Sequence, residues 1–259
     1  MRAPAIESLG LRSIRAVVEL GRFGRFGAAI LRSATRPPLR FRRLLAAAFD
    51  SGVESLPVIC LSGITVGGIL SFLGYSTLSR FGAEGSLGAV VGIGLVRELG
   101  PLLTGLLVTG RASSAIAAEI ASMVTTEQFD GLRMMSVDPV DFVVTPKALA
   151  MVLVMPLLSA LFIVFAFFGG YLVGVELLGV DSGTFLSSLE TSIDFGDDVA
   201  QSLTKAVSFG AISGFIATYR GTTCEPTAAG VSAATTSTVV NASVAILICD
   251  FALTMMWGV

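Results

Sequence analysis

The sequence predicts an all-α integral membrane protein, with an N-terminal interfacial amphipathic helix followed by about five transmembrane helices. Apolar residues make up 53% of the 259-residue chain, charged residues only 14%, and the mean hydropathy is +0.83. Ordinary soluble domains are far less apolar, and one membrane crossing needs about 20 apolar residues. We therefore divide the chain into a basic segment, 1–43, that supplies the interfacial helix and an anchor, and a transmembrane domain, 44–259.

The basic N-terminal segment fixes the expected orientation. Ten of the 17 Lys and Arg residues lie within residues 1–43, and positive charge near membrane spans marks the cytoplasmic side. A helix over 5–32 would place Arg12 and Arg22 on one face and Val17 on the other. Such a helix suits the cytoplasmic membrane surface, with its basic residues among lipid headgroups. A basic leader docked on a protein partner is the alternative.

Five apolar stretches follow, each long enough to cross a membrane: 53–78, 87–108, 142–175, 199–217 and 231–257. Between the second and third, the mixed segment 119–138 is too polar to cross and is expected in the cytoplasm. The acidic segment 176–198 contains no basic residue and is consistent with the periplasmic side. Pairs of glycines four residues apart recur in the apolar stretches and permit close helix contact, within the chain or between copies.

Charged residues inside these stretches are the candidate functional groups. Arg97 and Glu98 are the only ionisable residues of the second stretch, and Lys205 and Asp250 lie within the fourth and fifth. A charge at mid-bilayer costs about 2.5–3.5 kcal/mol, so we expect Glu98 to pair with Lys205, or Arg97 with Asp250. Pro101 removes a backbone donor and predicts a local irregularity. These charges could form a purely structural ion pair that holds the helices together. They could instead form the polar floor of an apolar cavity and contact a charged headgroup there, and we favour this second interpretation.

Chemistry absent from the sequence narrows the functional classes. The chain has no histidine, which excludes a Ser–His protease and a histidine metal site, and no G-x-x-x-x-G-K-[ST] nucleotide loop. An ATP-driven transporter would therefore need its ATPase as a separate chain. The mixed segment 119–138 would then offer large apolar side chains to a groove on that ATPase, namely Phe129, Met134 and Met135. A secondary carrier driven by an ion gradient through Glu98 and Asp250 is an alternative, and a membrane enzyme a weaker one.

Four motifs in order along the chain resemble the MlaE (YrbE) permeases: Leu95–Leu103, Thr109–Glu119, Thr126–Pro139 and Gly230–Val240. The resemblance implies a multi-pass protein of the bacterial inner membrane, the permease of an ABC transporter that moves phospholipids to or from a periplasmic MCE-protein carrier system and maintains outer-membrane lipid asymmetry. It implies a homodimer, a cytoplasmic ATPase that uses the ATP, often a STAS-domain protein, and a ring of MCE-domain subunits. It implies no cofactor in this chain and no nucleic-acid partner. Uptake of other hydrophobic molecules, such as sterols or solvents, is the alternative within the family.

The resemblance also implies which residues form the sites. A lipid cavity between two copies would take its polar surface from Arg97, Glu98, Lys205 and Asp250. Its lipid-facing wall would come from Leu70, Leu73, Tyr75 and Leu99. The segment 119–138 would be the coupling helix to the ATPase, with contacts from Glu119, Glu127, Gln128, Phe129, Met134 and Met135.

Overall fold

The computed structural model describes residues 3–35 and 41–257, and within them every regular element is a helix. The α-helices are α1 (Ala3–Ala34), α2 (Phe41–Val53), α3 (Leu56–Leu78), α4 (Leu87–Ile93), α5 (Gly100–Val108), α6 (Ser114–Thr125), α7 (Gln128–Met134), α8 (Thr145–Tyr171), α9 (Ser182–Ser192), α10 (Asp197–Thr222) and α11 (Ala228–Trp257). Short 3₁₀ turns η1 (Ser79–Phe81) and η2 (Glu84–Ser86) precede α4, and π-helical segments interrupt the longer helices: η3 (Gly94–Leu99), η4 (Thr109–Ser113), η5 (Val140–Val144) and η6 (Leu172–Leu177). The predicted all-α class is confirmed.

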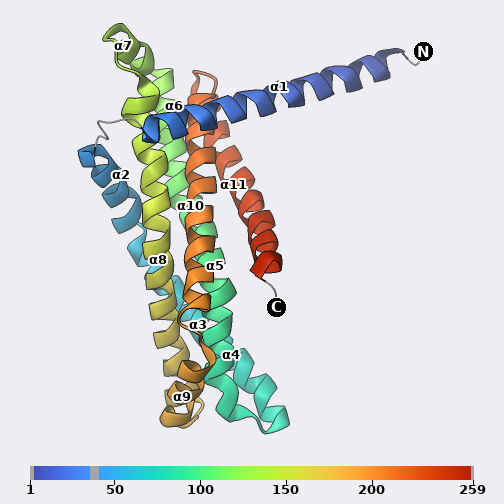
Figure 1. Ribbon diagram of the computed structural model, residues 1–259, viewed down its shortest axis with the longest axis vertical. Helices are drawn as coiled ribbons and strands as arrows, with labels where there is room; N and C mark the ends of the chain where they lie inside the picture. Colours follow the sequence, from blue (N-terminus) through green and yellow to red (C-terminus); the bar gives the residue numbers. More distant parts are fainter. Residues whose placement is uncertain (1–2, 36–40, 258–259) are drawn as a thin grey trace.

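Long helices run side by side along the molecule and form one elongated bundle (Figure 1). In the part of the chain that the structure describes, four are long and apolar enough to cross a membrane: Leu56–Phe81, Glu84–Thr125, Val140–Leu177 and Ala228–Trp257. The second and third are composite: α4, α5 and α6 join through η3 and η4, and η5 leads into α8, which continues into η6. The chain is thus a multi-pass membrane protein.

Helix α10 corresponds to the fifth expected crossing, but it is not among the four helices that are apolar enough to cross a membrane by composition alone. It packs against α8, α11 and α6, so its neighbours cover much of its surface. The side chains it buries include polar ones, Gln201, Ser202, Ser213 and Thr218 among them. A helix shielded from lipid by protein can carry polar groups that a lipid-facing helix cannot. We therefore attribute the position of α10 in the bundle to its burial by neighbouring helices rather than to an apolar composition.

Glycines allow the closest helix contacts, and these contacts lie within the chain. A Cβ on Gly67 of α3 would lie 1.8 Å from the carbonyl oxygen of Ala166 on α8, and one on Gly169 would lie 2.0 Å from that of Ile64. A Cβ on Gly210 of α10 would lie 2.6 Å from the Met151 carbonyl oxygen of α8. Small residues let backbones approach where no hydrophobic effect drives helix association. These glycines therefore allow close helix packing within a single subunit.

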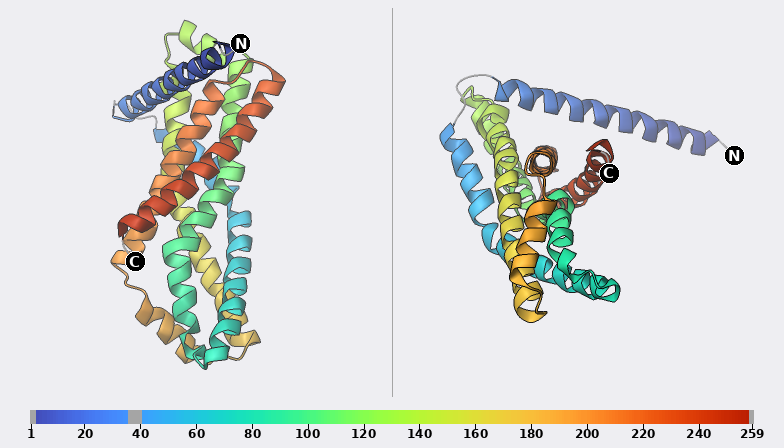
Figure 2. Two further views of the ribbon diagram at one scale, coloured as in Figure 1. Left: turned by 90° about the vertical axis from the view of Figure 1, so that its right-hand side faces the viewer. Right: turned by 60° about the horizontal axis from the view of Figure 1, so that its bottom comes forward.

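The two ends of the bundle differ. At one end, which we call the α1 end, α1 lies across the bundle rather than along it, close to α7 (Figures 1 and 2). Phe23 and Phe26 of α1 pack on Phe215 and Tyr219 of α10, in three edge-to-face pairs and one tilted pair, with ring centroids 4.4–5.8 Å apart. Aromatic contacts of this kind stabilise a docked helix. The crossing α1 is the arrangement expected of an interfacial helix.

At the opposite end, α9 occupies the acidic segment that was expected outside the membrane. Asp181 caps α9, because its carboxylate accepts hydrogen bonds from the Thr184 N–H at 2.8 Å and the Thr184 hydroxyl at 2.9 Å. These bonds to the charged form lower the pKa of Asp181. Phe185 is fully buried against the bundle, and Gly88 of α4 lies against its carbonyl oxygen. The cap and the aromatic anchor fix α9 on α4.

Several boundaries differ from the sequence-based expectation: the second span continues past residue 108 to Thr125, and α10 continues past residue 217 to Thr222. The first span begins at α3 rather than at residue 53. The helix is interrupted between the end of α2 and the start of α3, and Pro57 lies in the first turn of α3. Proline is accommodated there because its missing N–H would have no helical partner. The segment 119–138 is not one helix: its first part completes α6, and a left-handed Glu127, with φ of 57°, starts the separate helix α7.

Candidate functional site

The π-helical segment η3 places the charged pair of the second span. Pro101 follows η3 and has no N–H, so the Arg97 carbonyl lacks the donor that an α-helix would supply four residues on. The ammonium group of Lys205 donates a hydrogen bond to this carbonyl at 3.0 Å. The irregularity expected from Pro101 is therefore present. It leaves the Arg97 carbonyl oxygen free to accept a hydrogen bond from Lys205 of α10.

Lys205 is the centre of a charged cluster formed by η3, α10 and α11. Its side chain is 0% exposed, and its Nζ lies 2.7 Å from Glu98 Oε2 and 3.2 Å from Asp250 Oδ1. Nζ also donates to the Thr254 hydroxyl oxygen at 2.8 Å. The predicted Glu98–Lys205 pair is confirmed. A buried ammonium is tolerated here because two carboxylates and two further oxygens surround it.

Arg97 pairs with a residue that the sequence analysis does not single out. Its Nε donates to Asp198 Oδ1 at 2.6 Å, so the expected pair with Asp250 is wrong. Asp250 instead joins Glu98 around Lys205, because α11 faces α10 at this level. By composition, Asp198 belongs only to the acidic segment. Its spacing from Lys205, seven residues or about two helical turns, is the signal that both lie on one face of α10.

The cluster is buried on one side and open on the other. Lys205 and Asp198, both on α10, are 0% and 3% exposed at their side chains, whereas Glu98 and Arg97 on η3 are 38% and 41% exposed. The α10 charges therefore hold the η3 charges in place, and the η3 charges face outward from the chain. Within an otherwise apolar span, such outward charges need water, a ligand or another protein surface against them.

The residues expected to form a lipid-facing wall lie apart from the apolar groove and the polar cleft described below. Leu70, Tyr75 and Leu99 are partly buried and pack against the core of the bundle. Leu73 of α3 is mostly exposed. A wall made by two copies is not tested by one subunit, so their role stays a prediction.

An apolar groove lies on another side of the cluster, between α8, α10 and η3. Its volume is about 310 Å³, and it is lined mainly by apolar residues, among them Val96, Ile163, Phe167, Phe195 and Leu203. Pro156 lines it from within α8, where its ring interrupts the helix hydrogen bonding. No sequence pattern predicts this groove, because its lining comes from three separated segments.

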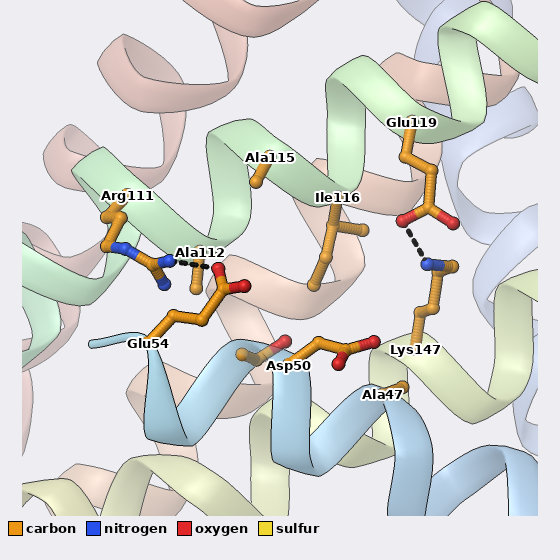
Figure 3. A pocket seen from close by; sticks show the side chains of 10 residues that line it. Ala47, Asp50, Glu54, Arg111, Ala112, Ala115, Ile116, Glu119 and Lys147 are labelled. Carbon is orange, nitrogen blue, oxygen red and sulfur yellow. Dashed lines mark hydrogen bonds and ion pairs between the residues drawn. The ribbon is translucent and has the colours of Figure 1, made fainter. Parts of the chain in front are cut away.

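A second, polar cleft of about 240 Å³ lies between α2, α6 and the start of α8, and residues of η4 also line it (Figure 3). Arg111 forms an ion pair with Glu54, and Lys147 forms one with Glu119, so two charged links cross the cleft. Asp50 points into the space between these pairs. Arg111 also donates to the Ser55 hydroxyl at 3.0 Å, at the break between α2 and α3. Glu119, expected to contact an ATPase, is therefore engaged with α8.

The other expected coupling residues lie on or beside α7, at the α1 end. Met134 and Met135 are 83% and 66% exposed, Glu127 starts the helix, and Gln128 donates to the Thr126 hydroxyl at 3.0 Å. Phe129 is different: it is buried and packs into the core, so it cannot enter a partner's groove from this position. Phe129 anchors α7 instead, and the methionines remain free for contact.

Comparison with known proteins gives consistent similarities over nearly the whole chain. Residues 44–256 match the family model described as Permease MlaE. The chain is 45% identical over 258 residues to the intermembrane phospholipid transport system permease protein MlaE of Haemophilus influenzae, covering 98% of this chain and 97% of that one. It is 41% identical over 250 residues to a probable ABC transporter permease protein of Rickettsia bellii, covering 96% of each. It is 32% identical to the chloroplastic protein TRIGALACTOSYLDIACYLGLYCEROL 1 of Arabidopsis thaliana, over 83% of this chain and 61% of that one.

Proposed function

Because the chain belongs to the MlaE permease family, we propose that it is the permease subunit of an ABC transporter that moves phospholipids between the bacterial inner membrane and a periplasmic carrier system of MCE proteins. ATP is hydrolysed by a separate cytoplasmic ATPase, and this chain holds no cofactor. The transport maintains the lipid asymmetry of the outer membrane. The observation that carries the proposal is the outward-facing charged pair on η3, held from behind by buried charges of α10.

The charged pair suits a phospholipid headgroup. Arg97 can bind a phosphate oxygen while Asp198 keeps its guanidinium oriented. Glu98 lies beside it and can accept a hydrogen bond from a headgroup donor while Lys205 balances its charge. Fixed polar groups at the base of an apolar site bind and orient a headgroup without a change in the bundle.

A homodimer provides the remaining walls of this site. Only 11% of the apolar window of α11 is buried within the chain, and exposed apolar residues line its surface, among them Val244, Leu247 and Phe251. α11 also contributes Asp250 and Thr254 to the charged cluster. A second copy packed near α11 would place two charged clusters beside one shared cavity. The wall residues Leu70, Leu73, Tyr75 and Leu99 would face it.

Coupling to the ATPase takes place at the α1 end, which is the cytoplasmic end in this proposal, as is the N-terminus. The exposed Met134 and Met135 form an apolar contact beside the charges of Glu127 and Asp130. Methionine side chains adapt well to a partner's groove. A STAS-domain protein binds on the ATPase side, and the MCE ring binds the opposite end, near α9.

The proposal is tested by reconstituting the complete complex in vesicles with a fluorescent phospholipid. ATP should drive transfer to the MCE protein, and Glu98→Ala should lower the rate roughly tenfold, the value of one charge-assisted hydrogen bond. Glu19→Ala is the matched control, since Glu19 is exposed on α1, away from the charged cluster, α7 and α9. A normal rate for Glu98→Ala would refute the role of the pair. Transfer driven by an ion gradient without the ATPase would overturn the ABC assignment in favour of a secondary carrier.

A further inference from the structure

A polar cavity at the α1 end is not part of the charged cluster or of the polar cleft. It lies between α1 and the connection from α7 to η5, and its volume is about 360 Å³. Two arginines of α1, Arg25 and Arg32, and two aspartates, Asp138 and Asp141, provide its charges. The rest of the lining is small or apolar: Ala28, Ala29, Ser33 and Val140.

The local sequence explains why the cavity exists. Arg25 and Arg32 are seven residues apart, so they lie on one face of α1, about two turns from each other. The alanines between them leave that face hollow. Across the cavity, the Asp138 carboxylate accepts a hydrogen bond from the Val140 N–H at 2.9 Å, which fixes the start of η5. The two arginines and the two aspartates are thus held on separate elements.

The charges of this cavity are not consumed by ion pairs. Throughout the described residues, no ion pair of 4.0 Å or less involves any of the two arginines and two aspartates. The cavity therefore presents two cations and two anions around an open space, with a formal charge of zero. Its ligand should carry one group of each sign, since either sign alone would leave like charges facing it.

We propose that this cavity binds the headgroup of a phospholipid that carries both a phosphodiester and a primary ammonium, as phosphatidylethanolamine does. Arg25 and Arg32 bind the phosphate, and Asp138 and Asp141 accept hydrogen bonds from the ammonium. The position fits a lipid of the membrane leaflet in contact with α1, because an interfacial helix lies at headgroup depth. The site is separate from the transport site and does not depend on the proposed dimer.

The lining distinguishes this headgroup from two others. Phosphatidylcholine carries a quaternary ammonium, which donates no hydrogen bond and is usually recognised by aromatic rings; the cavity lining contains none. Phosphatidylglycerol has the phosphate but no cation, so the two carboxylates would face a negative headgroup. The cavity should therefore select for the ammonium as well as for the phosphate.

The test is lipid binding to the purified full-length chain in mild detergent, measured by native mass spectrometry with each lipid alone. Wild type should bind phosphatidylethanolamine about tenfold more tightly than phosphatidylcholine or phosphatidylglycerol. Asp141→Asn should lower this preference, and Asp141→Lys should shift it toward phosphatidylglycerol. Arg32→Gln should weaken binding of all three, since each carries a phosphate. Arg22→Gln, an exposed arginine of α1 outside the cavity lining, is the control.

Ala29→Trp fills the cavity without removing a charge, and it should abolish the preference even if an aspartate variant fails to fold. Equal binding of the three lipids to wild type would overturn the proposal. So would a preference for phosphatidylglycerol that Arg32→Gln removes, because it would indicate a simple basic surface. An unchanged preference in Ala29→Trp would also refute the site. Since no transport is measured, a negative result leaves the proposed function unaffected.

Discussion

Replacing Lys205 with methionine should destabilise the bundle by leaving two carboxylates without their cation. In wild type, Nζ lies 2.7 Å from Glu98 Oε2 and 3.2 Å from Asp250 Oδ1, and it donates to the Arg97 carbonyl at 3.0 Å. Removing one partner of a buried ion pair costs about 3–5 kcal/mol. Because Glu98 is partly exposed, water or neighbouring groups offset part of this cost. We expect a loss of about 3 kcal/mol, at the lower end of the range.

The assay is thermal unfolding of the full-length chain in detergent, followed by far-ultraviolet circular dichroism. Lys205→Met should lower the unfolding temperature by several degrees. A triple variant, Lys205→Met with Glu98→Gln and Asp250→Asn, should recover most of the loss, since a neutral cluster leaves no buried charge unpaired. Both variants should transport poorly in the reconstituted complex.

Two results would refute this reasoning. Wild-type stability in Lys205→Met would mean that the charged cluster does not hold η3, α10 and α11 together. A triple variant no more stable than Lys205→Met would mean that lost packing around the lysine stem, rather than an unpaired charge, causes the destabilisation.

Two further predictions concern helix packing and coupling. Gly67→Ala should destabilise the chain by about 1–3 kcal/mol, because its methyl group would lie 1.8 Å from the Ala166 carbonyl oxygen and force α3 from α8. Gly110→Ala, which meets nothing within 4 Å, is the control in the same thermal assay, and equal behaviour of the two would contradict the close contact. Glu127→Lys should reduce co-purification of the ATPase without lowering the unfolding temperature, since Glu127 lies exposed at the start of α7. Glu225→Lys, at an exposed position in the α10–α11 connection, is its control; undiminished co-purification of the Glu127 variant would count against α7 as the coupling helix.

Part of the candidate site could be predicted because few charges occur in the apolar stretches. Glu98 and Lys205 are opposite charges inside spans, and hydrocarbon leaves such charges few partners other than each other. The Arg97 partner could not be chosen in this way. Asp198 stands at the boundary of a span, where water would also satisfy it, so its pairing depends on how α10 packs against η3.

For the coupling segment, 119–138, the sequence likewise could not predict which side chains are exposed. Its mixed composition predicted a segment outside the membrane, whereas its first part, up to Thr125, completes a helix long and apolar enough to span one; Met134 and Met135, beyond that helix, are exposed. Composition did not separate them from Phe129, which has a similar apolar side chain but lies buried against the core. The left-handed backbone at Glu127 turns α7 and decides which of its faces meets the bundle.

The sequence by itself determined that this protein is all-α and crosses the membrane several times, because long apolar stretches can satisfy their backbone hydrogen bonds in lipid only as helices. Its ordered motifs also identified the family. Only the tertiary structure decided which charges pair, that Gly67, Gly169 and Gly210 pack α3, α8 and α10 within one chain, and that a mixed-charge cavity opens beside α1. Those features join residues far apart in the chain. They depend on the rotation and depth of each helix against its neighbours, which side-chain packing sets and local sequence does not.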